Sequence, residues 1–86
     1  MNVVIYSTAR CPSCTRAENL LQSKGIAYDK ILVDNDIDKR NEMLQRSNGR
    51  RTVPQIFINE QHIGGYDDLA ELNRSGKLDQ LLNQEK

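Results

Sequence analysis

The sequence predicts an α/β domain in which a mixed four-stranded sheet carries helices on both faces. The chain has 86 residues, enough for one small domain but too few for two stable cores. Its apolar residues alternate between strand-like and helix-like spacing in the order β-α-β-α-β-β-α. A right-handed crossover in the first β-α-β unit makes its strands parallel, and a later hairpin adds antiparallel partners, so we expect a mixed sheet.

The first part of the chain predicts two strands with a helix between them. Residues 3–6 are apolar and mostly β-branched, which is typical of a short buried strand. From residue 12 to residue 24, apolar side chains recur at spacings of three and four, and Gly25 ends this amphipathic helix. Residues 28–33 supply the second strand.

The middle of the chain predicts a second helix and a third strand. Acidic residues within 35–38 suit the positive end of a helix, and the basic residues that follow suit its negative end near Asn48 and Gly49. Pro54 lacks an N–H group and can only begin a strand, which continues over Gln55–Ile58.

The last part predicts a hairpin and a third helix. Residues 59–60 form a tight turn into a strand at 62–64. Asp68 and Glu71 fit a capping box, so we expect Asp68 to cap a helix that stops at Gly76. Leucines at 78, 81 and 82 predict one or two further helical turns.

Composition and charge exclude several classes of function. Twelve Lys and Arg residues balance twelve Asp and Glu residues, which argues against capture of nucleic acid or an anionic membrane. No stretch approaches the roughly 18 apolar residues of a membrane span, and the opening segment lacks the basic flank of a secretory signal, so we expect a cytoplasmic protein. Two cysteines three positions apart are too few for a secreted disulfide scaffold, which suggests a chemical role for them.

The segment Cys11-Pro12-Ser13-Cys14 carries this chemistry. Proline is favoured at the first position of a helix, which makes Cys11 the N-cap and Cys14 the third helical residue. The unpaired N–H groups of Ser13 and Cys14 can then donate to the sulfur of Cys11 and favour its thiolate. Cys14 lies on the core side of the helix, so its thiol should be shielded and remain protonated. A stabilised thiolate is also a better leaving group, which predicts reversible thiol–disulfide exchange.

Two other interpretations of the cysteines stay open at this point. Both could be small buried hydrophobic residues, although a Cys-x-x-Cys pair beside a β-α-β pattern is itself a redox signal. They could also bind structural zinc, but zinc takes four ligands and the chain adds only His62 to the soft ligand types.

Three motifs together resemble a known family. The Cys-Pro-Ser-Cys segment is followed by Thr-Val-Pro-Gln-Ile-Phe-Ile at 52–58 and by Gly-Gly-Tyr-Asp-Asp-Leu at 64–69. In this order and at these separations they resemble small dithiol glutaredoxins of the bacterial type, over essentially the whole chain. The resemblance implies a thioredoxin-like fold, a single domain over residues 1–86, glutathione as the reductant, and no tightly bound cofactor or metal.

The resemblance also implies a glutathione site. The Val53–Pro54 peptide would be cis and face the cysteines, leaving the Val53 backbone free to pair with glutathione. Arg51 would meet the glycyl carboxylate, and the helix start at Asp67 and Asp68 would hold the γ-glutamyl end, as suits a Gly-Gly turn into a capped helix. The implied glutathione contacts are Arg51, Thr52, Val53, Pro54, Gly65, Tyr66, Asp67 and Asp68, with Pro12 and Ser13 in support.

Other conspicuous residues have simpler expected roles. Arg46 and Arg50 belong to a short basic run that is typical of a solvated surface, and Arg40 is a second choice for the glycyl carboxylate. Tyr6 is expected to pack in the core, and His62 to be a structural or surface histidine.

The sequence departs from the usual family pattern at three positions. The family commonly has Tyr where this chain has Ser13, Lys where it has Thr8, and an additional Cys where it has Tyr66. Ser13 removes an aromatic wall, and Tyr66 removes a third, regulatory thiol.

The expected function is reduction of glutathionylated proteins and protein disulfides by a monomer, with Cys11 as nucleophile and Cys14 as resolving thiol. Two alternatives are a dimer that holds a [2Fe-2S] cluster through Cys11 and two glutathiones, and a redoxin that depends on thioredoxin reductase.

Overall fold

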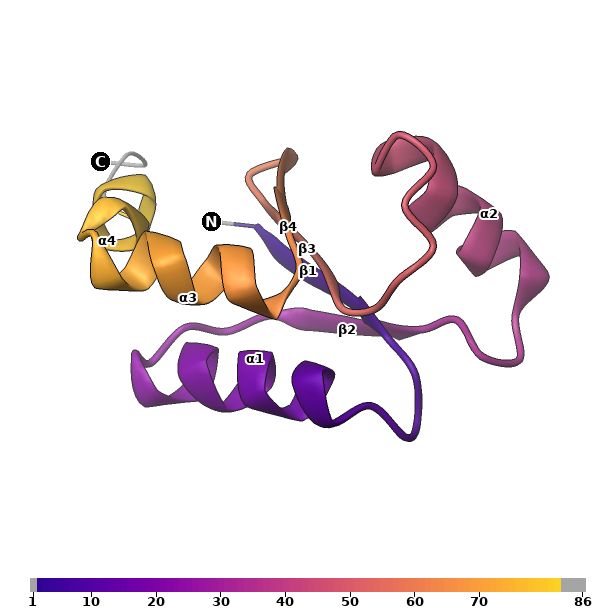
Figure 1. The fold of residues 1–86 in the computed structure, drawn as a ribbon, viewed down its shortest axis with the longest axis horizontal. Helices are drawn as coiled ribbons and strands as arrows, with labels where there is room; N and C mark the ends of the chain where they lie inside the picture. Colours follow the sequence, from indigo (N-terminus) through magenta and orange to yellow (C-terminus); the bar gives the residue numbers. More distant parts are fainter. Residues whose placement is uncertain (1, 83–86) are drawn as a thin grey trace.

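The computed structural model describes residues 2–82 and has the predicted order of elements, in which the further helical turns expected from the leucines at 78, 81 and 82 form a short last helix (Figure 1). The strand and helix types were all predicted correctly, with most bounds shifted by one or two residues. The elements are β1 (Val3–Ser7), α1 (Pro12–Ser23), β2 (Asp29–Leu32), α2 (Ile37–Arg46), β3 (Gln55–Ile58), β4 (Gln61–Gly64), α3 (Tyr66–Arg74) and α4 (Lys77–Leu82).

The four strands form one mixed sheet in the order β2-β1-β3-β4. Strand β1 runs parallel to β2 and antiparallel to β3, which in turn pairs antiparallel with β4. Tyr6, near the end of β1, lies opposite Gln55, the first residue of β3. The chain that leaves β1 therefore starts next to the chain that enters β3.

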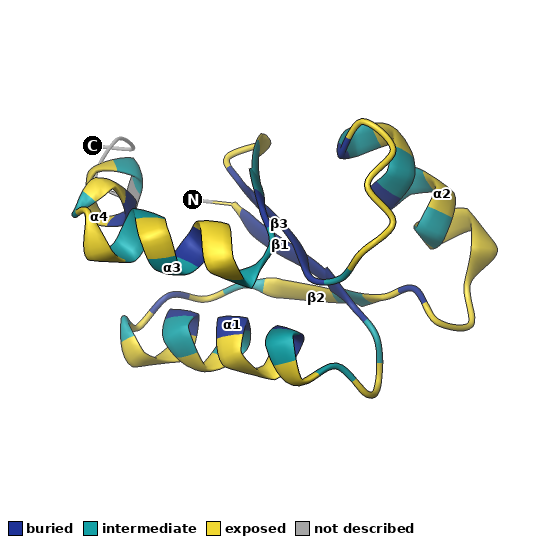
Figure 2. Ribbon diagram, viewed as in Figure 1, coloured by how far each residue is buried: buried dark blue, intermediate teal, exposed yellow. Residues whose placement is uncertain are grey.

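Helices cover both faces of the sheet, as predicted (Figures 1 and 2). Because successive side chains of a strand point to opposite faces, Val3 and Ile5 of β1 enter one core and Val4 and Tyr6 the other. The first core lies under α1, α3 and α4, and α2 covers the second. The first contains Val3, Ile5, Ala17, Leu21, Ile26, Ile56, Ile58, Leu69 and Leu78, and the second contains Val4, Tyr6, Val33, Met43 and Phe57.

The hairpin between β3 and β4 has a two-residue turn, since Ile58 pairs with Gln61. Asn59 and Glu60 both have positive φ angles, 52° and 68°, which is the conformation of a type I′ turn. This turn matches the right-handed twist of the flanking strands. Strand β4 consequently begins one residue earlier than predicted.

The start of α3 differs from the prediction. The N-cap is Gly65 and the helix begins at Tyr66, so Asp68 is the third helical residue and not the cap. The Asp68 carboxylate reaches back and accepts a hydrogen bond from the Gly65 N–H at 2.9 Å. The expected box between Asp68 and Glu71 is wrong because Gly65 has the extended backbone that an N-cap requires.

Candidate active site

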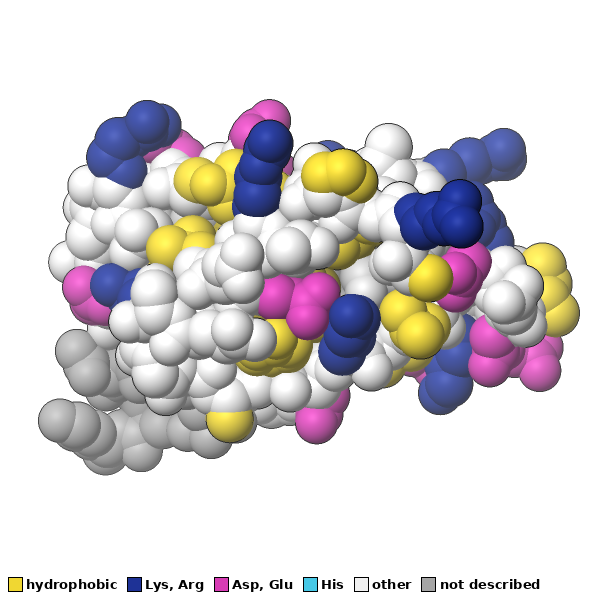
Figure 3. Space-filling view, turned by 90° about the horizontal axis from the view of Figure 1, so that it is seen from below, with side chains coloured by type: hydrophobic (Ala, Val, Ile, Leu, Met, Phe, Trp, Pro, Cys, Tyr) yellow, Lys and Arg dark blue, Asp and Glu magenta, His cyan; other side chains and the backbone are white. Residues whose placement is uncertain are grey.

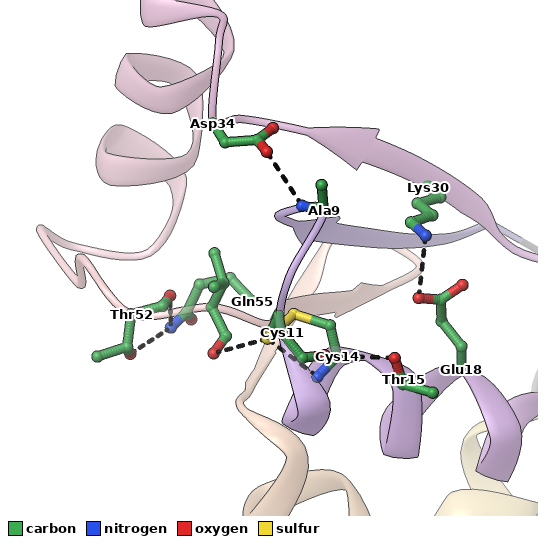
Figure 4. Close-up of a disulfide and its surroundings, with 10 residues drawn as sticks. Ala9, Cys11, Cys14, Thr15, Glu18, Lys30, Asp34, Thr52 and Gln55 are labelled. Carbon is green, nitrogen blue, oxygen red and sulfur yellow. Dashed lines mark hydrogen bonds and ion pairs between the residues drawn. A yellow bond between two sulfur atoms is a disulfide. The ribbon is translucent and has the colours of Figure 1, made fainter.

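Cys11 is the N-cap of α1, with an extended backbone (φ −140°, ψ 98°) and Pro12 directly after it. Its sulfur accepts a hydrogen bond from the Cys14 N–H at 3.1 Å. Of the two predicted donors, it is the Cys14 amide that makes this bond. The loop before Cys11 is held by Asp34, whose carboxylate accepts from the Ala9 N–H at 3.1 Å (Figure 4). The sulfur thus lies at the positive end of the helix, where negative charge is stabilised.

The two cysteines form a disulfide, with 5.1 Å between their Cα atoms (Figure 4). Cys14 is 2% exposed and lies on the buried side of α1, whereas Cys11 is partly exposed. Solvent and a partner molecule therefore reach the pair through Cys11. This difference in burial follows from position, since Cys11 precedes the helix and Cys14 occupies its core-facing side.

A second segment lies against the sulfur of Cys11. The Val53 carbonyl oxygen is 3.8 Å from the Cys11 Sγ, and the Val53–Pro54 peptide is cis. The predicted cis bond beside the cysteines is therefore confirmed. Val53 is half-buried and packs on the core under α2, and Pro54 is buried.

A buried glutamine fixes the segment before Pro54. Gln55 is fully buried, and its side-chain amide lies 2.9 Å from the Thr52 carbonyl and 3.2 Å from the Thr52 hydroxyl. Its other end lies 2.7 Å from the Nε2 atom of His62. The sequence analysis did not predict that Gln55 joins Thr52 to His62. The feature that could have indicated it is a polar residue within the otherwise apolar strand that follows Pro54.

His62 is partly buried and stacks on Phe57, with ring centroids 5.0 Å apart. Burial lowers the pKa of His62, the nearby Arg50 charge lowers it further, and Asp68 opposes both effects. The imidazole is therefore neutral at neutral pH. The expected structural role is consistent with this position, although the contact with Gln55 brings His62 into the network beside the cysteines.

The N-terminus of α3 forms the other side of the candidate site. One Asp68 oxygen accepts from the Gly65 N–H and lies 3.7 Å from the Arg50 guanidinium. Gly64 has a φ angle of 120°, and a Cβ atom there would collide with the Asp68 carboxylate. A surface pocket of about 260 Å³ extends from Asp68 toward His62. Asp67 is exposed in the first turn of the helix, and Tyr66 is half-buried.

Among the arginines near the site, Arg46 departs from the prediction, Arg50 is exposed as expected, and the contact of Arg51 with glutathione stays a prediction. Arg51 is exposed and makes no ion pair or hydrogen bond within residues 2–82, whereas Arg50 pairs with Asp68. Arg46 was expected on a solvated surface, but its guanidinium lies 4.3 Å from the centre of the Phe57 ring and donates to the Tyr6 hydroxyl at 2.7 Å. The aliphatic part of an arginine packs well on apolar surface, and its cation interacts with aromatic faces.

Charges on the α1 side of the molecule are mixed. Figure 3 shows basic and acidic side chains interspersed with hydrophobic ones on this face. One such pair is Lys30 and Glu18, 3.3 Å apart. Within residues 2–82 no helix is long and apolar enough to cross a membrane, and no group of three or more His, Cys, Asp or Glu side chains could hold a metal ion.

The fold and the site define a class of protein. The molecule has a mixed four-stranded sheet with helices on both faces, and a Cys-x-x-Cys pair lies at a helix N-terminus beside a cis-proline. These features are typical of thioredoxin-like thiol–disulfide oxidoreductases. The family model for glutaredoxin matches residues 3–63. The chain belongs to the glutaredoxin family.

Individual relatives agree with this assignment. Glutaredoxin 3 of Escherichia coli K12 is 54% identical over 81 residues, which cover 94% of this chain and 96% of that one. The solution structure of glutaredoxin from Brucella melitensis has a TM-score of 0.85 at 45% identity, covering 100% of this chain and 92% of that one. A crystal structure of a buckwheat glutaredoxin–glutathione complex has a TM-score of 0.85 at 36% identity, covering 95% and 76%.

Proposed function

We propose that this protein reduces mixed disulfides between glutathione and proteins, and disulfides within proteins, with glutathione as the electron donor. The single observation that carries the proposal is the position of the Cys11 sulfur. It lies at the N-cap of α1, accepts the Cys14 N–H, and is 3.8 Å from the Val53 carbonyl oxygen. A thiolate there is stabilised and partly exposed, next to backbone that an extended peptide such as glutathione can pair with.

The reaction with a glutathionylated protein has two exchanges. The Cys11 thiolate attacks the glutathione sulfur, a new disulfide forms between Cys11 and glutathione, and the protein thiolate leaves. A second glutathione thiolate then attacks that same glutathione sulfur, which releases oxidised glutathione and restores the Cys11 thiolate. With a protein disulfide, Cys14 attacks the Cys11 sulfur of the mixed disulfide and closes the bridge seen in this structure.

Glutathione would lie between the Thr52–Pro54 segment and the start of α3. The Val53 backbone would pair with the cysteinyl part, and Arg51 would meet the glycyl carboxylate. The N–H groups at Tyr66 and Asp67, after Gly65, would take the γ-glutamyl carboxylate and Asp68 its ammonium group. The buckwheat glutaredoxin of similar fold is seen in complex with glutathione, which supports this ligand. We place the reaction in the cytoplasm, where thiols are kept reduced.

The test separates the two cysteines. Cys11→Ser should reduce activity on a glutathionylated peptide to the background rate, because the nucleophile is lost. Cys14→Ser should retain that activity and lose activity on a protein disulfide, which needs the resolving thiol. Turnover is followed by coupling to glutathione reductase and NADPH. Equal loss of deglutathionylation in both variants would refute the proposed roles.

A second measurement tests the electron donor. The rate of reduction of the oxidised protein is measured with glutathione and, separately, with thioredoxin reductase. We expect glutathione to be faster, because Gly65, Tyr66, Asp67 and Asp68 form a helix N-terminus that suits its γ-glutamyl end. Faster reduction by thioredoxin reductase would contradict the proposal.

A further inference from the structure

The contacts of Gln55 determine how its amide is oriented. The Thr52 carbonyl can only accept a hydrogen bond, so the atom 2.9 Å from it must be the amide nitrogen of Gln55. The Gln55 oxygen then points to the Nε2 atom of His62 at 2.7 Å. Because an amide oxygen can only accept, the His62 Nε2 must carry the proton and donate it. The chain of donors therefore runs from His62 to Gln55 to Thr52.

His62 is held in place independently of this hydrogen bond. Its ring stacks on Phe57 at an interplanar angle of 29°, and Phe57 is 2% exposed. The Arg46 guanidinium also packs over Phe57. The direction of the Nε2–H bond is thus set by stacking on a buried side chain of β3.

Within residues 2–82, Thr52 makes no hydrogen bond besides those with Gln55. Residues 48–52 are exposed, yet the next residue, Val53, carries the carbonyl oxygen that lies beside the Cys11 sulfur. Two hydrogen bonds from one fully buried amide hold Thr52. If the Gln55 oxygen lost its donor, the buried amide would be free to turn or to shift toward another partner, because an unpaired buried polar group is costly.

We propose that His62 is a positioning residue for this site: by donating to Gln55 it fixes the Thr52 carbonyl, and with it the Val53 backbone that faces Cys11 and would pair with glutathione. The expected effect of His62 on KM for a glutathionylated peptide rests on the proposed function. The structural part of the proposal, the dependence of the Val53 backbone on the His62 donor, stands on the geometry alone.

The kinetic test uses the Cys14→Ser background, so that only the glutathione exchange is followed. His62→Phe keeps a ring against Phe57 and removes the donor, and we expect KM for a glutathionylated peptide to rise about fivefold, with kcat changed far less. His62→Gln restores an N–H donor on a side chain of similar reach and should bring KM back toward the starting value. An unchanged KM in His62→Phe, or an equal rise in His62→Gln, would overturn the proposal.

A control variant separates positioning from stability. The Tyr28 hydroxyl donates to Glu18 and accepts from Gln22, both at 2.9 Å, in a network that joins α1 to the residue just before β2. Tyr28→Phe should therefore lower stability and leave KM unchanged. A rise in KM in Tyr28→Phe equal to that in His62→Phe would show that KM follows stability, and would overturn the positioning role.

A measurement without turnover tests the same idea if the proposed reaction fails. In the free protein, the backbone amide NMR signals of Thr52 and Val53 should shift in His62→Phe and stay in place in His62→Gln and Tyr28→Phe. Unchanged signals in His62→Phe would overturn the proposal whatever the enzyme assay shows. Failure of the parent protein to act on a glutathionylated peptide would refute only the proposed function.

Discussion

At the scale of single residues, Gly64 shows how a small side chain shapes the candidate glutathione site. Its φ angle of 120° is uncommon for other residues, and the Asp68 carboxylate occupies the space that a Cβ atom would need. The Asp68 carboxylate can thus fold back against the chain and bond to the Gly65 N–H. The same carboxylate is proposed to receive the ammonium group of glutathione.

Gly64→Ala should therefore raise KM for a glutathionylated peptide by about tenfold, because the displaced carboxylate loses a charge-assisted contact with glutathione. Gly76→Ala is a matched control, since Gly76 also has a positive φ angle (82°) but nothing lies within 4 Å of its Cβ position. Both variants should lose stability from backbone strain, and only Gly64→Ala should change KM. An equal KM for the two variants would argue against a role of Asp68 in binding.

At the scale of elements, the β3–β4 hairpin sets the position of His62. Its two-residue turn fixes the register in which His62 lies opposite Phe57, and this pairing brings the imidazole over the buried ring. Type I′ turns need two residues with positive φ, a conformation that asparagine tolerates and glutamate does not favour. Glu60 therefore carries a conformational cost in this turn.

Replacing Glu60 by glycine gives the Asn-Gly pair that type I′ turns prefer. We expect Glu60→Gly to raise the free energy of unfolding by about 0.5–1 kcal/mol, because glycine removes the cost of a positive φ angle. Urea unfolding monitored by circular dichroism measures this change. A decrease in stability would show that the Glu60 side chain contributes more than its backbone conformation costs.

At the scale of the whole molecule, the stability of the protein in acid depends on His62, which lies on β4 and stacks on Phe57 of β3. Burial, and then Arg50, lower the pKa of His62 in the folded protein below the value of about 6.5 expected when unfolded. When the pH falls below about 6.5, His62 becomes protonated in the unfolded chain but stays neutral in the folded chain until the pH reaches its lower pKa there. The His62 contribution to stability is therefore complete above pH about 6.5 and decreases as the pH falls toward the lower, folded-state pKa.

The parent protein should consequently lose more stability than His62→Gln when the pH is lowered from about 7.5 to about 5.5, a range above the titration of ordinary carboxylates. The measurement is the urea midpoint at each pH for both proteins. Parallel decreases would mean that protonation of His62 does not contribute to the loss.

The local features of this protein follow from its amino-acid sequence. The spacing of apolar residues predicted the order of the strands and helices. Pro12 predicted that Cys11 is the N-cap and that Cys14 lies on the buried side of α1. These features depend on neighbours within one or two helical turns, so a linear pattern contains them. The cis bond before Pro54 came from family resemblance, since local preferences alone favour trans.

Contacts between distant segments were decided by the tertiary structure. Strands β1 and β3 are antiparallel with Tyr6 opposite Gln55, and this register brings the Thr52–Val53 segment beside Cys11. The same arrangement joins Gln55 to His62 and brings Arg50 to Asp68. A sequence records which side chains can donate, accept or carry charge, but strand register and turn geometry determine which of them meet.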